Sequence, residues 1–107
     1  MTCTQYDLFL VNLDPTIGSE IKKTRPCVVL SPNELNNNLN TLIIAPITST
    51  SKPYPTRLQT KSVKPYGWIA LDQIRTIDKK RITKKIGQLS PDEISACKRI
   101  LEELLVW

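Results

Sequence analysis

The chain has 107 residues, 40% of them apolar and 23% charged, which suits one globular domain, 1–107, with a modest buried core. No apolar run reaches membrane-spanning length, and the first residues lack the segments of a signal peptide, so we expect a cytoplasmic protein without a membrane partner. The net charge is +5, and the charges are unevenly distributed along the chain. Residues 1–89 carry 13 Lys and Arg against 6 Asp and Glu, whereas residues 90–107 carry 2 Lys and Arg against 4 Asp and Glu. A basic body favours a polyanionic or acidic partner, although a merely solvated surface would show the same balance.

The cysteine and histidine content narrows the chemistry. Three cysteines without paired spacing and no histidine argue against a disulfide scaffold and a zinc site, and we expect neither metal nor cofactor. Cys27 and Cys97 occupy apolar positions and are predicted to be buried, while Cys3 is predicted to lie in a frayed terminus. Without histidine, a proton transfer would use carboxylates, hydroxyls, arginine, lysine or water.

The first half of the chain predicts three strands separated by polar loops. Residues 6–13 are apolar and rich in β-favouring types, and residues 16–24 are predicted to form a long exposed loop. Residues 27–30 and 41–47 are nearly continuous apolar runs, which is typical of buried strands. Between them, one helical turn is compatible with the start of the connection, and the asparagine cluster 36–40 is predicted to be a connecting loop.

The middle of the chain predicts further short strands. A hydroxyl-rich loop follows the third strand, and residues 55–60 are compatible with a short strand that points Arg57 outward. Residues 66–71 predict another strand, in which Gly67 indicates a bulge or a close backbone approach. Residues 75–85 carry six basic side chains between isoleucines, which predicts two short strands with basic outer faces.

The end of the chain predicts one helix. Ser90, Pro91 and Glu93 match an N-cap, a first-turn proline and a capping-box glutamate. An apolar stripe at helical spacing follows and is expected to pack on the sheet; it comprises Ile94, Cys97, Leu101 and Leu104, flanked by Ile100 and Leu105. Several short strands and one C-terminal helix favour a mainly β fold closed into a small barrel.

Charged and hydroxyl groups gather at three strand ends. These are Glu20, Lys22, Lys23 and Arg25 before one strand, Thr48 and Ser49 after another, and Asp72, Gln73 and Arg75 after a third. If the ends meet, an arginine, two hydroxyls and a carboxylate would form a site suited to phosphate. The structural alternative is an ion pair of Arg25 with Glu20 or Asp72, and spacing alone favours that alternative.

Five motifs in register, at residues 12–20, 25–32, 46–49, 72–77 and 87–93, resemble the MazF/PemK family of toxin endoribonucleases. The resemblance implies an SH3-like barrel with a C-terminal helix, which forms a homodimer and belongs to a type II toxin–antitoxin pair. It further implies metal-independent, sequence-specific cleavage of single-stranded mRNA by 2′-hydroxyl attack, which leaves 2′,3′-cyclic phosphate and 5′-hydroxyl ends and inhibits translation. A cognate antitoxin with an acidic C-terminal tail is expected to compete with RNA.

The resemblance assigns roles to individual residues. Arg25 matches the catalytic arginine, Thr48 the catalytic hydroxyl residue with Ser49 beside it, and Glu20 a loop acid of the site. Arg25 would stabilise charge on a five-coordinate phosphorus, and Thr48 would hydrogen-bond the scissile phosphate.

The residue that takes the 2′-hydroxyl proton stays open between Glu20 and Asp72, with Gln73 beside Asp72 as a supporting residue. The PemK-like branch uses an arginine two residues before the motif aspartate, and this chain has Ala70 there. The departure favours the arrangement around Arg25 and Thr48.

RNA contacts are expected from basic, hydroxyl and aromatic side chains around the site, namely Ser19, Lys22, Lys23, Lys52, Tyr54, Arg57, Lys79, Lys80 and Arg81. Trp68 is expected in the core or a dimer contact, and Trp107 is compatible with self-association. Two other readings stay open: a non-catalytic toxin of the same fold that binds DNA gyrase, and a plain RNA-binding barrel.

Overall fold

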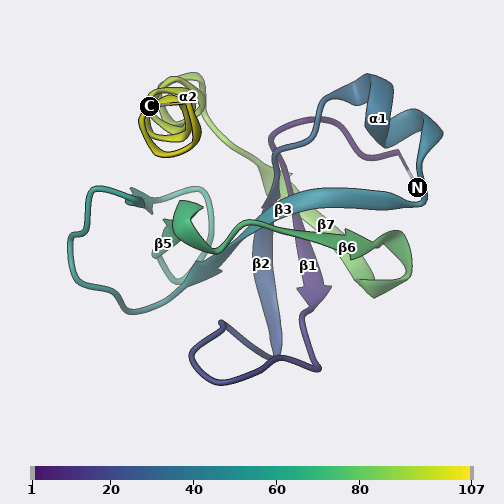
Figure 1. Cartoon of the computed structure of the whole chain (residues 1–107), viewed down its shortest axis with the longest axis horizontal. Helices are drawn as coiled ribbons and strands as arrows, with labels where there is room; N and C mark the ends of the chain where they lie inside the picture. Colours follow the sequence, from purple (N-terminus) through teal and green to yellow (C-terminus); the bar gives the residue numbers. More distant parts are fainter. Residues whose placement is uncertain (1, 107) are drawn as a thin grey trace.

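The computed structural model describes residues 2–106 and consists of seven strands, two α-helices and two short 3₁₀ turns (Figure 1). In chain order these are β1 (Asp7–Asn12), β2 (Thr24–Val29), α1 (Asn33–Asn38), β3 (Thr41–Thr48), β4 (Arg57–Thr60), β5 (Gly67–Ala70), η1 (Leu71–Gln73), β6 (Arg75–Asp78), η2 (Lys79–Arg81), β7 (Ile82–Gln88) and α2 (Pro91–Leu105). The segment 13–23 is called the β1–β2 loop below, and the segment 49–56 the β3–β4 loop.

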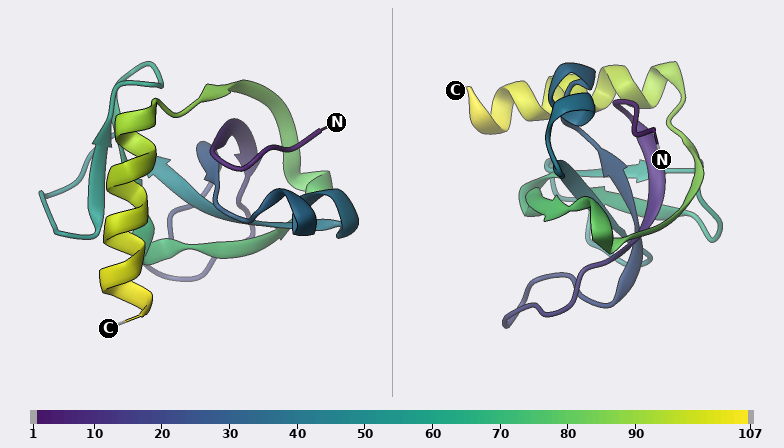
Figure 2. Two further views of the ribbon diagram at one scale, coloured as in Figure 1. Left: turned by 90° about the horizontal axis from the view of Figure 1, so that it is seen from above. Right: turned by 90° about the vertical axis from the view of Figure 1, so that its right-hand side faces the viewer.

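The strands form one antiparallel sheet in the order β4-β5-β3-β2-β1-β7, and β6 pairs with β3 beside β5. The sheet curls into a barrel-like shape without closing, and α2 lies over its β4–β5 end next to η1 (Figures 1 and 2). The mainly β fold with a C-terminal helix is therefore confirmed. Within residues 2–106, no helix has the length and apolar character needed to cross a membrane.

The continuous apolar runs have a structural cause, because the central strands are buried on both faces. Cys27 and Val29 pack in one core cluster with Phe9, whereas Val28 packs in a second cluster with Leu8. Successive side chains of a strand point to opposite faces, so a strand between two cores must be apolar at every position.

Helix α2 begins as predicted. Ser90 Oγ accepts a hydrogen bond from Glu93 N at 3.3 Å, and Ser90 N donates to Glu93 Oε1 at 2.9 Å, which completes the capping box. The apolar stripe packs on the second core cluster through fully buried Cys97 and its half-buried neighbours. Leu104 and Leu105, at the end of the stripe, remain exposed.

Two predictions about the first half of the chain are wrong. Cys3 is buried, not frayed, because hydrogen bonds from Tyr6 N to Val29 O (2.7 Å) and from Thr4 N to Asp7 Oδ2 (3.0 Å) fasten this segment to the sheet. The asparagine cluster is not simply a loop, because three of its members lie in α1. Trp107, expected to favour self-association, lies outside the described residues.

A buried polar contact explains α1. Asn36 is 2% exposed, its Nδ2 donates to Ser31 O at 2.8 Å, and its Oδ1 accepts from Ser31 Oγ at 2.5 Å. Ser31 Oγ also accepts from Ile43 N at 3.1 Å. The Asn36 side chain thereby joins α1 to Ser31, and Ser31 in turn joins it to β3.

Candidate active site

Arg25 and Thr48 lie at the ends of neighbouring strands. The β2–β3 ladder pairs Val28 with Ala45 and Cys27 with Pro46, and continuing this register by two residues brings Arg25 level with Thr48. Residues that lie level in an antiparallel pair point to the same face. The strand register therefore gives these two side chains a common face at the end of the ladder.

A hollow of about 100 Å³ adjoins Arg25 and Ser49, whereas Thr48 does not line it. It is lined by Arg25, Pro26, Ile47, Ser49, Val63, Lys64, Pro65 and Gly67. Arg25 is half-buried, and its Nε donates to Lys22 O at 3.2 Å, which is the only hydrogen bond of its guanidinium among residues 2–106. The terminal nitrogens remain available to an anion, and a guanidinium donates to two phosphate oxygens in parallel.

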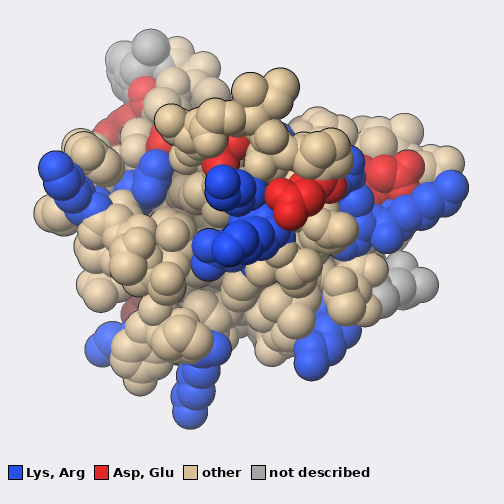
Figure 3. Space-filling model, turned by 90° about the horizontal axis from the view of Figure 1, so that it is seen from below, with Lys and Arg blue, Asp and Glu red and all other residues tan. Residues whose placement is uncertain are grey.

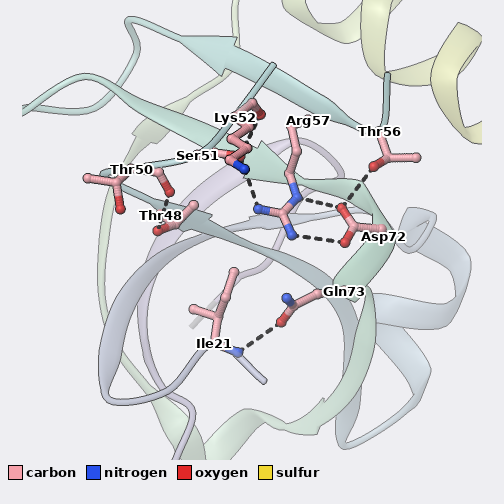
Figure 4. Close-up of polar contacts among 9 residues, drawn as sticks. All are labelled: Ile21, Thr48, Thr50, Ser51, Lys52, Thr56, Arg57, Asp72 and Gln73. Atoms are coloured by element: carbon pink, nitrogen blue, oxygen red, sulfur yellow. Dashed lines mark hydrogen bonds and ion pairs between the residues drawn. The ribbon is translucent and has the colours of Figure 1, made fainter. Parts of the chain in front are cut away.

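Thr48 is held at the start of the β3–β4 loop. Its Oγ1 donates to Thr50 O at 3.1 Å, as Figure 4 shows, and its backbone pairs with that of Trp68 in β5. The Thr48 side chain is half-buried, as is that of Arg25, while Ser49 is exposed. The hydroxyl proton of Thr48 is therefore directed into its own loop, and Thr48 donates to a bound anion only after its hydroxyl turns away from Thr50 O.

A second, larger hollow of about 400 Å³ lies between the β1–β2 loop and η1. It is lined by Ser19, Glu20, Ile21, Pro46, Asp72, Gln73, Ile74 and Arg75. Pro46 and Thr48 are two residues apart in β3 and so share one face of that strand. The hollow therefore opens on the face to which Thr48 points.

Glu20 is exposed at this hollow and also shapes the loop that carries it. Its Oε1 accepts a hydrogen bond from Ile17 N at 2.6 Å. The other side of the loop is held by Gln73, whose Oε1 accepts from Ile21 N at 2.8 Å (Figure 4). The carboxylate thus lies between the turn at the loop tip, which it closes with Ile17, and the loop base, which Gln73 anchors.

Asp72 belongs to an ion pair that the sequence did not predict. Its carboxylate binds Arg57 through Nε–Oδ1 (2.6 Å) and Nη2–Oδ2 (3.0 Å). Arg57 therefore turns inward, contrary to the expected outward orientation, and the expected pairing of Arg25 with Asp72 or Glu20 does not occur among the described residues. The hydrogen bond from Arg57 is the main cause that holds the pKa of Asp72 below its ordinary value.

The side chains expected to contact RNA fall into two groups. Ser19, Lys22, Lys23, Lys52, Tyr54 and Lys80 are exposed. Three cations have partners within the chain: Arg57 on Asp72, Lys79 Nζ on Asn36 O, and Arg81 Nη1 on Asn12 O and Asp14 O. Figure 3 shows basic side chains spread over the lower face with acidic ones among them.

The base of the β1–β2 loop is fastened by residues that sequence reasoning did not single out as anchors. Leu13 N donates to Lys23 O at 3.0 Å, and Lys23 N donates to Asp14 Oδ1 at 3.0 Å. Arg75 Nη1 donates to Leu13 O at 3.1 Å. Arg75, at the start of the basic 75–85 segment, thus helps to hold the base of this loop.

The buried thiols take no part in this site. Burial raises the pKa of Cys27 to about 12 and that of Cys97 to about 11, so both stay protonated at neutral pH and are poor nucleophiles. Among residues 2–106, His, Cys, Asp and Glu side chains form no group of three that could hold a metal ion.

Known proteins resemble this chain in sequence and in structure. Residues 4–105 match the profile of a family described as PemK-like, MazF-like toxin of type II toxin–antitoxin system. The endoribonuclease toxin MazF of Escherichia coli strain K12 is 35% identical over 100 residues, which are 92% of this chain and 90% of that protein.

Two solved structures share the fold. The crystal structure of MazF from Deinococcus radiodurans superposes with a TM-score of 0.89 at 25% identity and covers 100% of this chain and 99% of that one. A mycobacterial endoribonuclease in complex with its cognate antitoxin superposes with a TM-score of 0.82 at 18% identity, over 97% and 95% of the two chains. The family predicted from the five motifs is thereby confirmed: this chain belongs to the PemK-like, MazF-like toxins of type II toxin–antitoxin systems.

Proposed function

We propose that this protein is the toxin of a type II toxin–antitoxin pair and cleaves single-stranded RNA at specific sequences, with Arg25, Thr48 and Glu20 as its catalytic residues. The observation that carries the proposal is the β2–β3 register, which, continued by two residues past the Cys27–Pro46 pair, brings Arg25 level with Thr48; a hollow adjoins Arg25. Support comes from the relative in Escherichia coli, which is named an endoribonuclease toxin.

The proposed reaction is an internal transesterification. The ribose 2′-oxygen attacks the adjacent phosphorus, a bond forms between them, and the bond from phosphorus to the 5′-oxygen breaks. The 2′-hydroxyl loses its proton to a base, and the leaving 5′-oxygen receives a proton. The products are a 2′,3′-cyclic phosphate and a 5′-hydroxyl end.

Arg25 and Thr48 act on the phosphate. The free guanidinium nitrogens of Arg25 bind the non-bridging oxygens, whose negative charge grows as phosphorus becomes five-coordinate. Thr48 turns its hydroxyl from Thr50 O to a phosphate oxygen, to which it donates, with Ser49 beside it. Arg25 is already held by its bond to Lys22 O, so its free donors need little reorganisation when the transition state forms, and their effect is on the rate.

Glu20 is the better candidate for the base. It is exposed at the larger hollow, whereas Asp72 is occupied by Arg57 and has a lowered pKa, which makes it a weaker proton acceptor. Glu20→Gln is expected to lower the rate about a hundredfold or more and to remove the acidic limb of the pH–rate profile. A retained acidic limb in Glu20→Gln would assign the base elsewhere.

RNA contacts outside the reacting phosphate come from exposed side chains. Lys22, Lys23, Lys52 and Lys80 follow the phosphate backbone, and Ser19 and Tyr54 meet bases by hydrogen bonding and stacking. Removing one lysine should weaken binding similarly for all RNA sequences and reduce its salt dependence.

The partners follow from the same family. A crystal structure from Deinococcus radiodurans contains MazE together with MazF, and the mycobacterial endoribonuclease is in complex with its cognate antitoxin. For this chain we propose a homodimer that binds a cognate antitoxin, whose acidic tail competes with RNA for the basic side chains. Because mRNA is the substrate, we place the protein in the cytoplasm.

The experiment is incubation of the purified protein with a long single-stranded RNA in EDTA. The proposal predicts a few discrete cuts, mapped by sequencing the new ends. RNA that stays intact, whether bound or not, would contradict it, and inhibition of DNA gyrase with intact RNA would identify the non-catalytic alternative.

A further inference from the structure

The ion pair of Arg57 and Asp72 is a two-point contact in a partly shielded position. The two N···O contacts measure 2.6 and 3.0 Å, and the side chains are 14% and 32% exposed. Parallel guanidinium–carboxylate bonds fix orientation as well as distance, in contrast to a single contact between mobile surface charges. This pair can therefore hold the segments that carry it in one arrangement.

On one side the pair fastens the β3–β4 loop, which directly follows Thr48. Arg57 Nη1 donates to Ser51 Oγ at 3.2 Å, and Thr56 Oγ1 donates to Asp72 Oδ1 at 3.1 Å. The ring of Tyr54 lies 5.9 Å from Arg57 Cζ. Three residues of the loop thus contact the ion pair.

On the other side the pair leads to the β1–β2 loop, which carries Glu20. Gln73 directly follows Asp72 in η1, and its side chain accepts from Ile21 N at 2.8 Å. Leu71 N, at the start of the same turn, donates to Thr56 O at 3.1 Å. Figure 4 shows η1 between the two loops, with Asp72 directed to one and Gln73 to the other.

We propose that Arg57 and Asp72 are positioning residues that couple the β3–β4 loop to the β1–β2 loop through η1, and so determine which RNA sequences are cut. The inference rests on the proposed function, because it concerns the selectivity of that same cleavage. In a single-stranded RNA, unpaired bases are read by side chains on loops. Two loops that keep a fixed relative position admit fewer sequences than two that move independently.

The inference differs from two simpler roles for the same residues. If Arg57 bound a phosphate directly, its removal would weaken RNA binding and reduce its salt dependence, and removal of Asp72 would not. If Asp72 were the base, its removal would cost far more rate than removal of Arg57. A positioning pair predicts equal effects, because either change opens the same contact.

The test compares Arg57→Ala, Asp72→Ala, the double variant, and the milder Arg57→Lys and Asp72→Asn. Lys85→Ala is the matched control, because it also removes one positive charge from an ion pair, in this case with Asp7 at 3.4 Å. For each protein, kcat/KM is measured on oligonucleotides that carry the preferred cut sequence or one of its single-base variants. Thermal unfolding confirms that each variant is folded at the assay temperature, and the milder variants keep the test valid if an alanine variant does not fold.

The expected result is a loss of about tenfold or more in the ratio of kcat/KM between the preferred sequence and its variants. The loss should be equal in both single alanine variants and no larger in the double variant, since coupled residues are non-additive. Arg57→Lys should recover part of the ratio, and Lys85→Ala should retain all of it.

Three results would overturn the inference. An unchanged kcat/KM ratio in the variants would show that the pair does not couple the loops. A loss of the ratio confined to the Arg57 variants, together with a weaker salt dependence of RNA binding, would make Arg57 an RNA contact. Inactivity confined to the Asp72 variants would make Asp72 the base. Failure of the proposed function is distinguishable from all three, because the wild-type protein would then cut no RNA.

Discussion

Gly67 lies against the backbone of Thr48, so that a Cβ on Gly67 would stand 2.9 Å from Thr48 O and 2.7 Å from Ile47 Cγ2. The close approach predicted for Gly67 is thereby confirmed. This contact seats β5 against the last residues of β3, where the catalytic hydroxyl is proposed to lie.

Gly67→Ala is therefore expected to destabilise the protein by about 1–3 kcal/mol and to lower RNA cleavage, because the added methyl must push β3 or β5 aside. Urea unfolding gives the stability, and cleavage is measured where both proteins are folded. Gly18→Ala is the comparison: its Cβ would meet no atom within 4 Å, and only its φ of +59° opposes the change. A fully stable and active Gly67→Ala protein would contradict the close approach.

Asn36→Ala is expected to lower the free energy of unfolding by about 1–3 kcal/mol. The change leaves Ser31 without the side-chain partner that satisfies its hydroxyl and carbonyl, in a place where water does not reach. Asn37→Ala, at the neighbouring exposed position of α1, should change stability by less than about 0.5 kcal/mol. Equal values for the two variants in urea unfolding would show that the buried contact is not stabilising.

Glu93 makes stability depend on pH. Burial raises its pKa, but hydrogen bonds from Ser62, Thr60 and Ser90 outweigh burial and lower the pKa to about 2, from an ordinary value of 4.5. A lowered pKa means that the ionised carboxylate stabilises the folded state above pH 4.5, and that this contribution is lost as pH falls towards 2.

Glu93→Gln should therefore be less stable than the wild type by about 1–2 kcal/mol at pH 7, with a difference that shrinks between pH 4.5 and 2. Thermal unfolding at several pH values measures it. Glu103→Gln, which changes an exposed charge on the same helix, serves as the control. A difference that stays constant with pH would mean that the charge of Glu93 is not what stabilises this helix end.

The sequence predicted the strands and the C-terminal helix because their signals are local. Apolar runs, turn residues and the capping box around Ser90 each lie within a few residues of one another. The exceptions depend on distant partners: Asn36 is helical because Ser31 binds it, and Cys3 is buried because the backbone of Tyr6 joins Val29.

The candidate site was predictable in part for the same reason. The positions of Arg25 and Thr48 follow from where two apolar runs begin and end. The pair of Arg57 and Asp72 was not predictable, because it depends on the register of two four-residue strands, in which Arg57 lies opposite Ala70. Short strands with few apolar positions do not specify their register in the sequence.

The central claim is that Arg25 and Thr48 act on one phosphate. The most direct measurement is analysis of the RNA ends produced in EDTA by the wild type, Arg25→Ala, Thr48→Ala and the hydroxyl-retaining Thr48→Ser, each shown to be folded. The account predicts 2′,3′-cyclic phosphate and 5′-hydroxyl ends from the wild type, a loss of cleavage of about a hundredfold or more in both alanine variants, and partial activity in Thr48→Ser. Undiminished cleavage in both alanine variants, or wild-type products that carry a 5′-phosphate, would contradict it.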